Sequence, residues 1–234
     1  MSYHISEATG NEYSVFKKGQ QGWQQIVGQL CLNTHYPAPG PLVLDGYFGP
    51  ESDRVAKEVQ SALGVAPDGS VGPETQRAYV IAKCKHAEKG VTPAGLLSGI
   101  NDMESSYYWA VVSPLNDNGT RDVGSTQVSL NWPADEPHLL GAFNIDASQH
   151  VLAGEVLGFY KYAINHVPNQ RAWEISALYH NWPVASYAIA EGRESYLNKP
   201  FAFTTAKGYP TGLAYANHYI DVSSAPVTSW TPAP

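Results

Sequence analysis

The amino-acid sequence predicts a mainly α-helical protein with two domains. An eight-residue motif that opens a helix occurs twice in the first 80 residues, and apolar residues recur at helical spacing around both copies. The length of 234 residues leaves room for two domains of ordinary size. We expect a first domain over residues 1–88, with its core at about 13–86, a second domain over 89–222, and a flexible tail over 223–234.

The composition is that of a globular protein and excludes two classes of partner. Apolar residues make up 43% of the chain and charged residues 15%. The formal net charge is −7, and no run of Lys and Arg is longer than two residues. We therefore expect no nucleic-acid partner, which would need a basic surface. No apolar run is long enough to cross a bilayer, so we expect no membrane anchor. We expect a monomer.

The first expected helix precedes the repeated motif. Trp23, Ile26, Val27 and Leu30 follow the spacing i, i+3, i+4, i+7, which places them on one face of a helix. This face predicts a helix that packs against the two helices opened by the motif.

The repeated motif consists of a turn followed by a helix start. The segment 45–52 recurs as 68–75, with five of eight positions identical. In each copy Asp-Gly favours a tight turn, an apolar residue then points inward, and Gly-Pro-Glu opens a helix. The two copies predict helices over about 50–63 and 73–85.

This pair of turns resembles the three-helix peptidoglycan-binding domain of bacteria and phages. That domain repeats the turn with a Gln-bearing helix between the copies, and Gln60 lies on the corresponding helix here. The resemblance implies a wall-binding module, with peptidoglycan glycan strands as the partner. Its candidate contact residues lie in the turns: Asp45, Gly46, Asp68 and Gly69. These residue types also build turns, and both roles remain open.

A second series of elements begins near Thr92. Thr92 followed by Pro93 is typical of a helix N-cap with proline at the first position, and predicts a helix start there. The apolar face of this helix ends at Glu104. The polar, glycine-bearing segment 116–128 predicts a shaped loop or a short hairpin, and a long helix is expected over 147–166.

The order of motifs in this half resembles the soluble lytic transglycosylase domain, which is related to goose-type lysozyme. An apolar helix ends in Glu104-Ser105, and the segment 118–128 follows the pattern Asn-Gly-Ser/Thr-x-Asp-φ-Gly-x-x-Gln-φ, in which φ is an apolar residue. Later segments match in the same order: Asn144-Ile145, 177–181 and 219–222. The likeness covers about 92–222. It implies a lysozyme-like α (α+β) catalytic domain.

Two positions depart from the family pattern. Ser125-Thr126 stands where the family has Leu-Met, which alters packing beside the site. His180-Asn181 stands where the family has Asn and a variable residue. The second change leaves open whether Tyr179 or Asn181 contacts the sugar.

Glu104 is the candidate catalytic acid. Glycoside cleavage needs a proton on the leaving oxygen, and a carboxylic acid supplies it near neutral pH when an apolar setting raises its pKa to about 6. The apolar helix before Glu104 and the Tyr-Tyr-Trp sequence after it predict such a setting. The resemblance implies substrate-binding roles for further residues: Ser105, Asp122, Gln127, Tyr179, Asn181 and Tyr219. A structural polar role stays open for Gln127, Tyr179 and Asn181, and a loop role that caps backbone N–H groups stays open for Asp122.

The resemblance implies a phage endolysin that cleaves the MurNAc-β-1,4-GlcNAc bond. In that family one Glu acts as acid and then as base, and the products carry 1,6-anhydro-MurNAc ends. A first alternative is a hydrolytic lysozyme in which Asp117 or Asp122 assists Glu104, because hydrolases of this kind use two carboxylates. A second alternative is a non-catalytic wall-binding virion protein.

No cofactor or metal is expected. Cys31 and Cys84 lack metal-ligand spacing, and they are either free thiols or one disulfide. The polar N-terminal segment lacks a signal-peptide core. We expect synthesis in the host cytoplasm and action on the wall after holin-type release, with a virion-associated lysin as the alternative.

Overall fold

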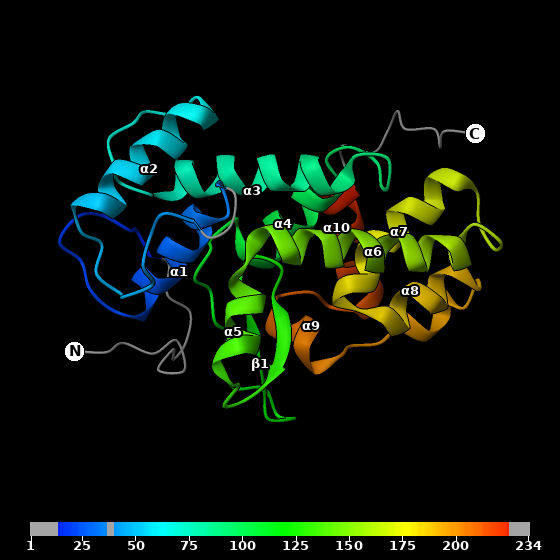
Figure 1. Ribbon diagram of the computed structural model, residues 1–234. Coiled ribbons are helices and arrows are strands. Elements are labelled where there is room, and N and C mark those ends of the chain that lie inside the picture. Colours follow the sequence, from blue (N-terminus) through cyan, green and yellow to red (C-terminus); the bar gives the residue numbers. More distant parts are fainter. Residues whose placement is uncertain (1–13, 37–39, 225–234) are drawn as a thin grey trace. The chain divides into compact units, whose positions relative to one another are not determined.

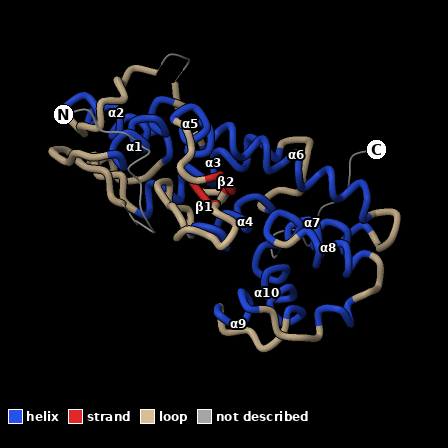
Figure 2. The backbone as a smooth tube through the Cα atoms, turned by 90° about the horizontal axis from the view of Figure 1, so that it is seen from below, coloured by secondary structure: helices blue, strands red, loops and turns tan. Residues whose placement is uncertain are grey.

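The computed structural model describes residues 14–36 and 40–224, and this part of the chain is mainly helical (Figure 1). It contains ten α-helices, one 3-10 helix and one two-stranded antiparallel sheet, whose strands are red in Figure 2. The elements are α1 (Trp23–Asn33), α2 (Pro50–Leu63), α3 (Pro73–Glu88), α4 (Leu96–Ser105), β1 (Thr120–Val123), β2 (Val128–Asn131), α5 (Glu136–Phe143), α6 (Ile145–Ala163), α7 (Asn169–Asn181), α8 (Pro183–Ala190), η2 (Glu194–Leu197), α9 (Ala202–Ala206) and α10 (Gly212–Ser224).

The chain forms two compact units. The first comprises the residues up to Lys83 together with 104–149, and the second comprises 84–103 together with the residues from His150 onward. The chain passes from one unit to the other within α3, α4 and α6. The two domains expected over 1–88 and 89–222 stay a prediction.

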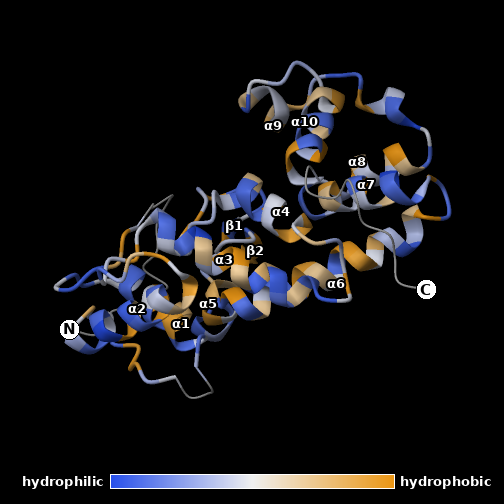
Figure 3. Cartoon of the chain, turned by 90° about the horizontal axis from the view of Figure 1, so that it is seen from above, coloured by the Kyte–Doolittle hydropathy of each residue, from blue (hydrophilic) through white to orange (hydrophobic). Residues whose placement is uncertain are grey.

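The repeated motif opens helices where it was expected to do so. α2 begins at Pro50 after Gly49 and carries acidic residues in its first turn. It ends before Gly64, which adopts the left-handed conformation at φ 72° and so terminates the helix. α3 begins at Pro73 and runs to Glu88, slightly beyond the expected end. In Figure 3 hydrophobic and hydrophilic residues alternate along these helices, as expected where one face is buried.

The segment 104–149 shares a core with α1 and α3 within the first unit. Trp109 is fully buried, and its ring centroid lies 5.8 Å from that of Phe16 and 4.9 Å from that of Tyr79. Phe143, at the end of α5, lies 6.0 Å from the ring of Trp23 on α1. The turn-and-helix repeat thus packs directly on residues that follow Glu104 in the chain.

The second unit is built around α7, α8 and α10. Its buried residues come from these helices and from α6 and η2, and include Phe159, Leu178, Ile189, Leu197 and Ile220. The first two residues of the expected tail, Ser223 and Ser224, belong to α10 and are buried. The remainder, 225–234, lies outside the described residues.

The helix expected to begin at Thr92-Pro93 begins instead at Leu96, so that prediction is wrong. The buried carboxylate of Glu88 accepts hydrogen bonds from the backbone N–H groups of Gly95 (2.8 Å) and Leu97 (2.6 Å). A side chain from the end of α3 therefore caps α4, and the Thr92 hydroxyl does not.

Within the two described stretches of chain, no helix combines the length and apolar character needed to cross a membrane.

Candidate functional site

The first turn of the repeat is organised by a buried glutamine on α1. The Gln29 amide nitrogen donates to the Asp45 carboxylate (2.8 Å) and to the Tyr47 carbonyl (3.0 Å), and its amide oxygen accepts from the Gly46 N–H (3.1 Å). The same Asp45 oxygen accepts from the Tyr47 N–H at 2.9 Å. Gly46 adopts φ 72°, the left-handed conformation that a glycine tolerates best.

The second turn repeats this arrangement around Gln60 on α2. The Gln60 amide nitrogen donates to Asp68 (2.9 Å) and to the Ser70 carbonyl (3.0 Å), and its oxygen accepts from the Gly69 N–H (2.8 Å). Asp68 accepts from the Ser70 N–H at 2.8 Å. The Ser70 N–H and the Gln60 amide, in that order, hold the pKa of Asp68 below its ordinary value.

The four residues singled out in these turns thus make turn contacts. One carboxylate oxygen each of Asp45 and Asp68 is engaged by its turn, and the N–H groups of Gly46 and Gly69 are engaged by glutamines. Sequence reasoning matched Gln60 to the repeat but missed Gln29. The separation from Gln29 to Asp45 is longer than that from Gln60 to Asp68, so no common spacing reveals the pair.

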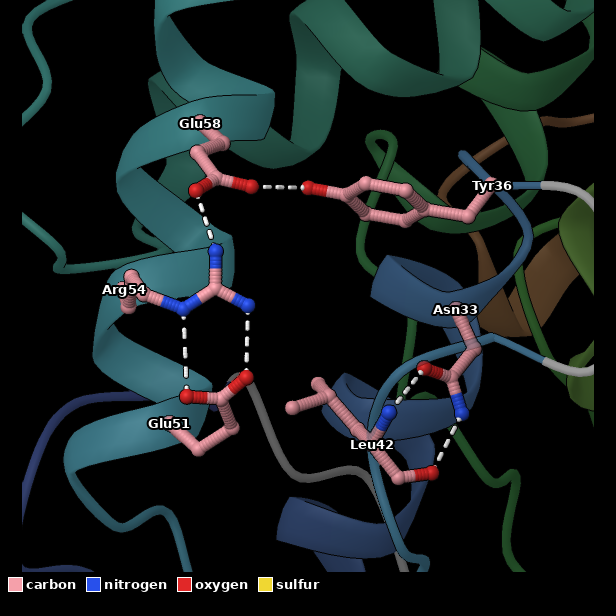
Figure 4. A network of polar contacts seen from close by, with 6 residues as sticks. All are labelled: Asn33, Tyr36, Leu42, Glu51, Arg54 and Glu58. Atoms are coloured by element: carbon pink, nitrogen blue, oxygen red, sulfur yellow. Dashed lines mark hydrogen bonds and ion pairs between the residues drawn. The ribbon is translucent and has the colours of Figure 1, made fainter.

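A polar network lies on α1, α2 and the chain that follows α1 (Figure 4). Arg54 bonds to Glu51 and Glu58 on the same face of α2, and the Tyr36 hydroxyl donates to Glu58 at 2.6 Å. Burial and then the bond to Glu58 raise the pKa of Tyr36 to about 12. Asn33 exchanges two 2.8 Å hydrogen bonds with the backbone of Leu42.

Glu104 is the penultimate residue of α4 and is partly buried. Leu97 and Ile100 of the same helix are fully buried, and the adjoining Ser105 is 6% exposed. Directly after α4, Ser106 and Tyr107 both adopt left-handed backbone conformations, at φ 50° and 67°. Two consecutive non-glycine residues in this region cost free energy that the surrounding structure must offset.

Residues of α3 hold the segment that follows Glu104 in the chain. The Arg77 guanidinium lies 5.2 Å from the centroid of the Tyr107 ring. Gln76 accepts the Trp109 backbone N–H at 3.0 Å, and its carbonyl accepts the indole N–H at 3.2 Å. Two residues of α3 thus hold Tyr107 and Trp109, which follow the candidate acid in the chain.

The expected loop or hairpin is the antiparallel pair β1–β2, in which Asp122 lies opposite Ser129. Backbone bonds tie β1 to the preceding chain, from Ser113 N–H to Asp122 (2.8 Å) and from Gly124 N–H to Val111 (2.8 Å). The half-buried Asp122 carboxylate accepts from the Asn116 amide at 3.4 Å, whereas Asp117 is exposed.

Gly124 and Gln127 shape the bend between the strands. Gly124 adopts φ 77°, and a Cβ atom there would lie 2.6 Å from the Ala142 carbonyl oxygen. Gln127 adopts φ 51°, and its amide nitrogen donates to the Gly124 carbonyl at 2.8 Å. Ser125 and Thr126 are each 1% exposed, so the departure from the family pattern at these positions lies in packed interior.

Left-handed backbone at non-glycine positions is confined to the two motifs that define this candidate site. Among residues 14–36 and 40–224 it occurs at Ser106, Tyr107 and Gln127. Such conformations cluster at functional sites, where the structure holds side chains in a required position.

Tyr179, on α7 in the second unit, packs among aromatic rings. Its ring stacks on Phe159 at 4.6 Å and meets Tyr187 at 5.9 Å. Burial is the first cause that raises the pKa of Tyr179. The neighbouring His180 Nδ1 lies 2.8 Å from a carboxylate oxygen of Glu155 on α6, a pair that sequence reasoning did not identify.

Asn181 faces a different neighbour. Its side-chain oxygen accepts from the Tyr215 hydroxyl at 2.9 Å, and the 1% exposed Tyr219 lies 6.2 Å from Tyr215. Residues two apart on a helix point about 200° apart. Tyr179 and Asn181 therefore lie on opposite sides of α7, and a sugar on one side contacts at most one of them directly.

The structure thus groups the candidate residues within each unit. Asp122 and Gln127 share one hairpin in the first unit, to which the chain after Glu104 and Ser105 is hydrogen-bonded. Asn181 and Tyr219 adjoin the same tyrosine in the second unit.

Both cysteines are buried free thiols, which resolves the alternatives of free and bonded. Burial raises the pKa of Cys31 and of Cys84. In the described part of the chain, His, Cys, Asp and Glu residues form no group of three or more that fits a metal ion.

A comparison with known protein families finds no match, and a search of curated proteins finds none either.

Proposed function

We propose that this protein is an endolysin that cleaves the MurNAc-β-1,4-GlcNAc bond of peptidoglycan, with Glu104 as the general acid and base. One observation carries the proposal: the left-handed non-glycine residues of the described chain are Ser106 and Tyr107, which directly follow the Glu104-Ser105 pair, and Gln127. The resemblance of the sequence to the transglycosylase family singled out Glu104 and Gln127, and left-handed backbone at or close to these residues is an independent property of the structure.

The proposed reaction needs one carboxyl group. Protonated Glu104 donates its proton to the glycosidic oxygen, which leaves with the GlcNAc residue as its 4-hydroxyl. The 6-hydroxyl of the same MurNAc attacks C1, and the Glu104 carboxylate accepts the proton of that hydroxyl. One C–O bond breaks, one C–O bond forms, and Glu104 ends protonated for the next turnover.

The single-acid reaction gives no catalytic role to the two aspartates of segment 116–128, Asp117 and Asp122. A water-activating carboxylate has to present an oxygen to the water. The Asp122 carboxylate accepts from Asn116, and Asp117 lies on an exposed turn. These positions fit a hairpin stabilised by Asp122 and a solvated Asp117.

We also propose that the protein combines a three-helix wall-binding module with a lysozyme-like catalytic domain. The turn repeat supports the wall-binding module. Gln29 and Gln60 make matching hydrogen bonds to two Asp-Gly turns, and each turn leads into a helix that starts with proline. A protein with both activities would concentrate its catalytic residues on an insoluble substrate.

The test is digestion of purified sacculi, followed by mass spectrometry with and without borohydride reduction. We expect muropeptides that carry 1,6-anhydro ends, which borohydride leaves unchanged. Fully reducible MurNAc ends, together with a large loss of rate in Asp122→Asn, would identify a hydrolytic lysozyme. Absence of any soluble product would leave a non-catalytic wall-binding protein.

A further inference from the structure

Tyr47 presents an aromatic ring to solvent from a backbone that is fixed at several points. The side chain belongs to a residue that is 42% exposed. The Tyr47 N–H donates to Asp45, its carbonyl accepts from Gln29, and Tyr47 forms an antiparallel bridge with Gln21. Ordering a ligand on this ring would therefore cost little further backbone entropy.

The Tyr47 ring packs against the backbone of Gly49. A Cβ atom at Gly49 would lie 2.9 Å from Cε1 and 3.1 Å from Cδ1 of Tyr47, which shows that the ring lies against the Gly49 backbone. Gly49 has an extended conformation, φ −86° and ψ −169°, that any residue adopts. Glycine at this position therefore leaves room for the Tyr47 ring, whereas the backbone conformation itself does not require a glycine.

The fold does not need an aromatic residue in this turn. Ser70 is the equivalent residue in the second turn, where Gln60 and Asp68 make the same backbone bonds. A Cβ atom at Gly72, the equivalent of Gly49, would meet nothing within 4 Å. The two turns thus share the same backbone hydrogen bonds, and only the first carries an aromatic side chain, that of Tyr47.

We propose that Tyr47 is a stacking platform for a sugar ring of the wall glycan. The apolar C–H face of a pyranose fits the flat face of a tyrosine, and the phenol hydroxyl provides a polar contact at the edge. Asp45 lies two residues away, and its second carboxylate oxygen takes no part in the turn bonds, so it offers an acceptor for a sugar hydroxyl. This inference rests on the proposed wall-binding function, and it moves the main contact from the turn glycines to Tyr47.

The test uses the full chain with matched variants of the two turns. Binding to purified sacculi is measured by pelleting at 4 °C over a range of sacculus concentrations. We expect Tyr47→Ala to weaken binding roughly three- to tenfold. Tyr47→Phe, which keeps the ring and loses the hydroxyl, should bind more tightly than Tyr47→Ala, and Ser70→Ala, in the equivalent turn, should stay within about twofold of the parent.

A second pair of variants tests the contact between Gly49 and the Tyr47 ring while the ring is kept. Gly49→Ala displaces the Tyr47 ring and should weaken binding, whereas Gly72→Ala should not. Thermal melts of all variants report folding. Parental binding by Tyr47→Ala, or equal losses in the Gly49 and Gly72 variants, would overturn this inference alone. A parent protein that remains in the supernatant would overturn wall binding, and cleavage of soluble glycan fragments would report on Glu104 separately.

Discussion

Among single residues, Glu88 is a buried carboxylate with a structural task. It is 3% exposed and caps α4 by accepting the N–H groups of Gly95 and Leu97. Loss of solvation outweighs these two bonds, so the pKa of Glu88 is raised above its ordinary value. The N-terminus of α4, the helix that carries Glu104, is thus capped by a carboxyl group whose charge depends on pH.

We predict that Glu88 makes the stability of the protein fall as pH rises above the ordinary Glu pKa of about 4.3. A raised pKa means that the folded state binds the proton more tightly than the unfolded state. The stabilisation is therefore complete below the ordinary Glu pKa and is lost as pH rises through the folded value. Urea unfolding of the parent and of Glu88→Gln at pH values from the ordinary Glu pKa upward isolates the effect. A constant difference between the two proteins would contradict the prediction.

Residue-level prediction from sequence succeeded where a local pattern exists. The position of Glu104 at the end of an apolar helix follows from the spacing of Leu97 and Ile100. The pairs Gln29–Asp45 and His180–Glu155 were missed because each joins residues that lie far apart in the sequence. No periodicity links such partners, so only tertiary structure reveals them.

Within the β1–β2 hairpin, Gly124 combines a backbone conformation with a close approach. It adopts φ 77°, and a Cβ atom would lie 2.6 Å from the Ala142 carbonyl oxygen. Gly119 is a matched control, because it adopts φ 81° with nothing within 4 Å of its Cβ position. Comparison of the two separates backbone strain from collision with α5.

We predict that Gly119→Ala lowers the free energy of unfolding by about 1 kcal/mol and Gly124→Ala by roughly 3 kcal/mol. The first change imposes left-handed backbone on alanine, and the second adds a clash with main-chain atoms that have little freedom to move. Urea unfolding measures both. Equal losses would show that the contact with Ala142 is easily relieved.

Helix boundaries followed from sequence where the chain itself supplies the start and stop signals. α2 matches its expected range because Gly49-Pro50 opens it and Gly64 closes it. The start of α4 was misplaced because its cap is the Glu88 side chain, which reaches back from the preceding helix. A local pattern such as Thr92-Pro93 does not reveal that a competing cap is present.

For the whole molecule, the first compact unit joins the turn repeat to residues that follow Glu104. The Cys31 thiol on α1 donates to the Phe143 carbonyl at 3.5 Å, and Trp109 packs on Phe16 and Tyr79. Sequence reasoning drew the expected domain boundary at residue 88 because the helix opened by the second copy of the motif was expected to end shortly before it. The contacts of residues 104–149 with the turn repeat join segments that are far apart in the sequence, so residue spacing and composition could not predict them.

These contacts predict that Cys31 is far more reactive in a fragment of residues 1–88 than in the full chain. The fragment lacks Phe143 and Trp109, so we expect the core around Cys31 to be exposed to solvent in it. With Cys84→Ala in both proteins, we expect the full chain to react with a thiol reagent at least about tenfold more slowly. Equal protection in the fragment would instead support a module that folds alone.

Glu104→Gln tests most directly whether Glu104 transfers the proton in glycan cleavage. The exchange keeps the size of the side chain and removes the transferable proton. Release of soluble muropeptides from purified sacculi should fall by roughly a hundred- to ten-thousand-fold. The thermal melt and the binding to sacculi should match those of the parent. Release within a few-fold of the parent rate would contradict the account and assign the acid to another residue.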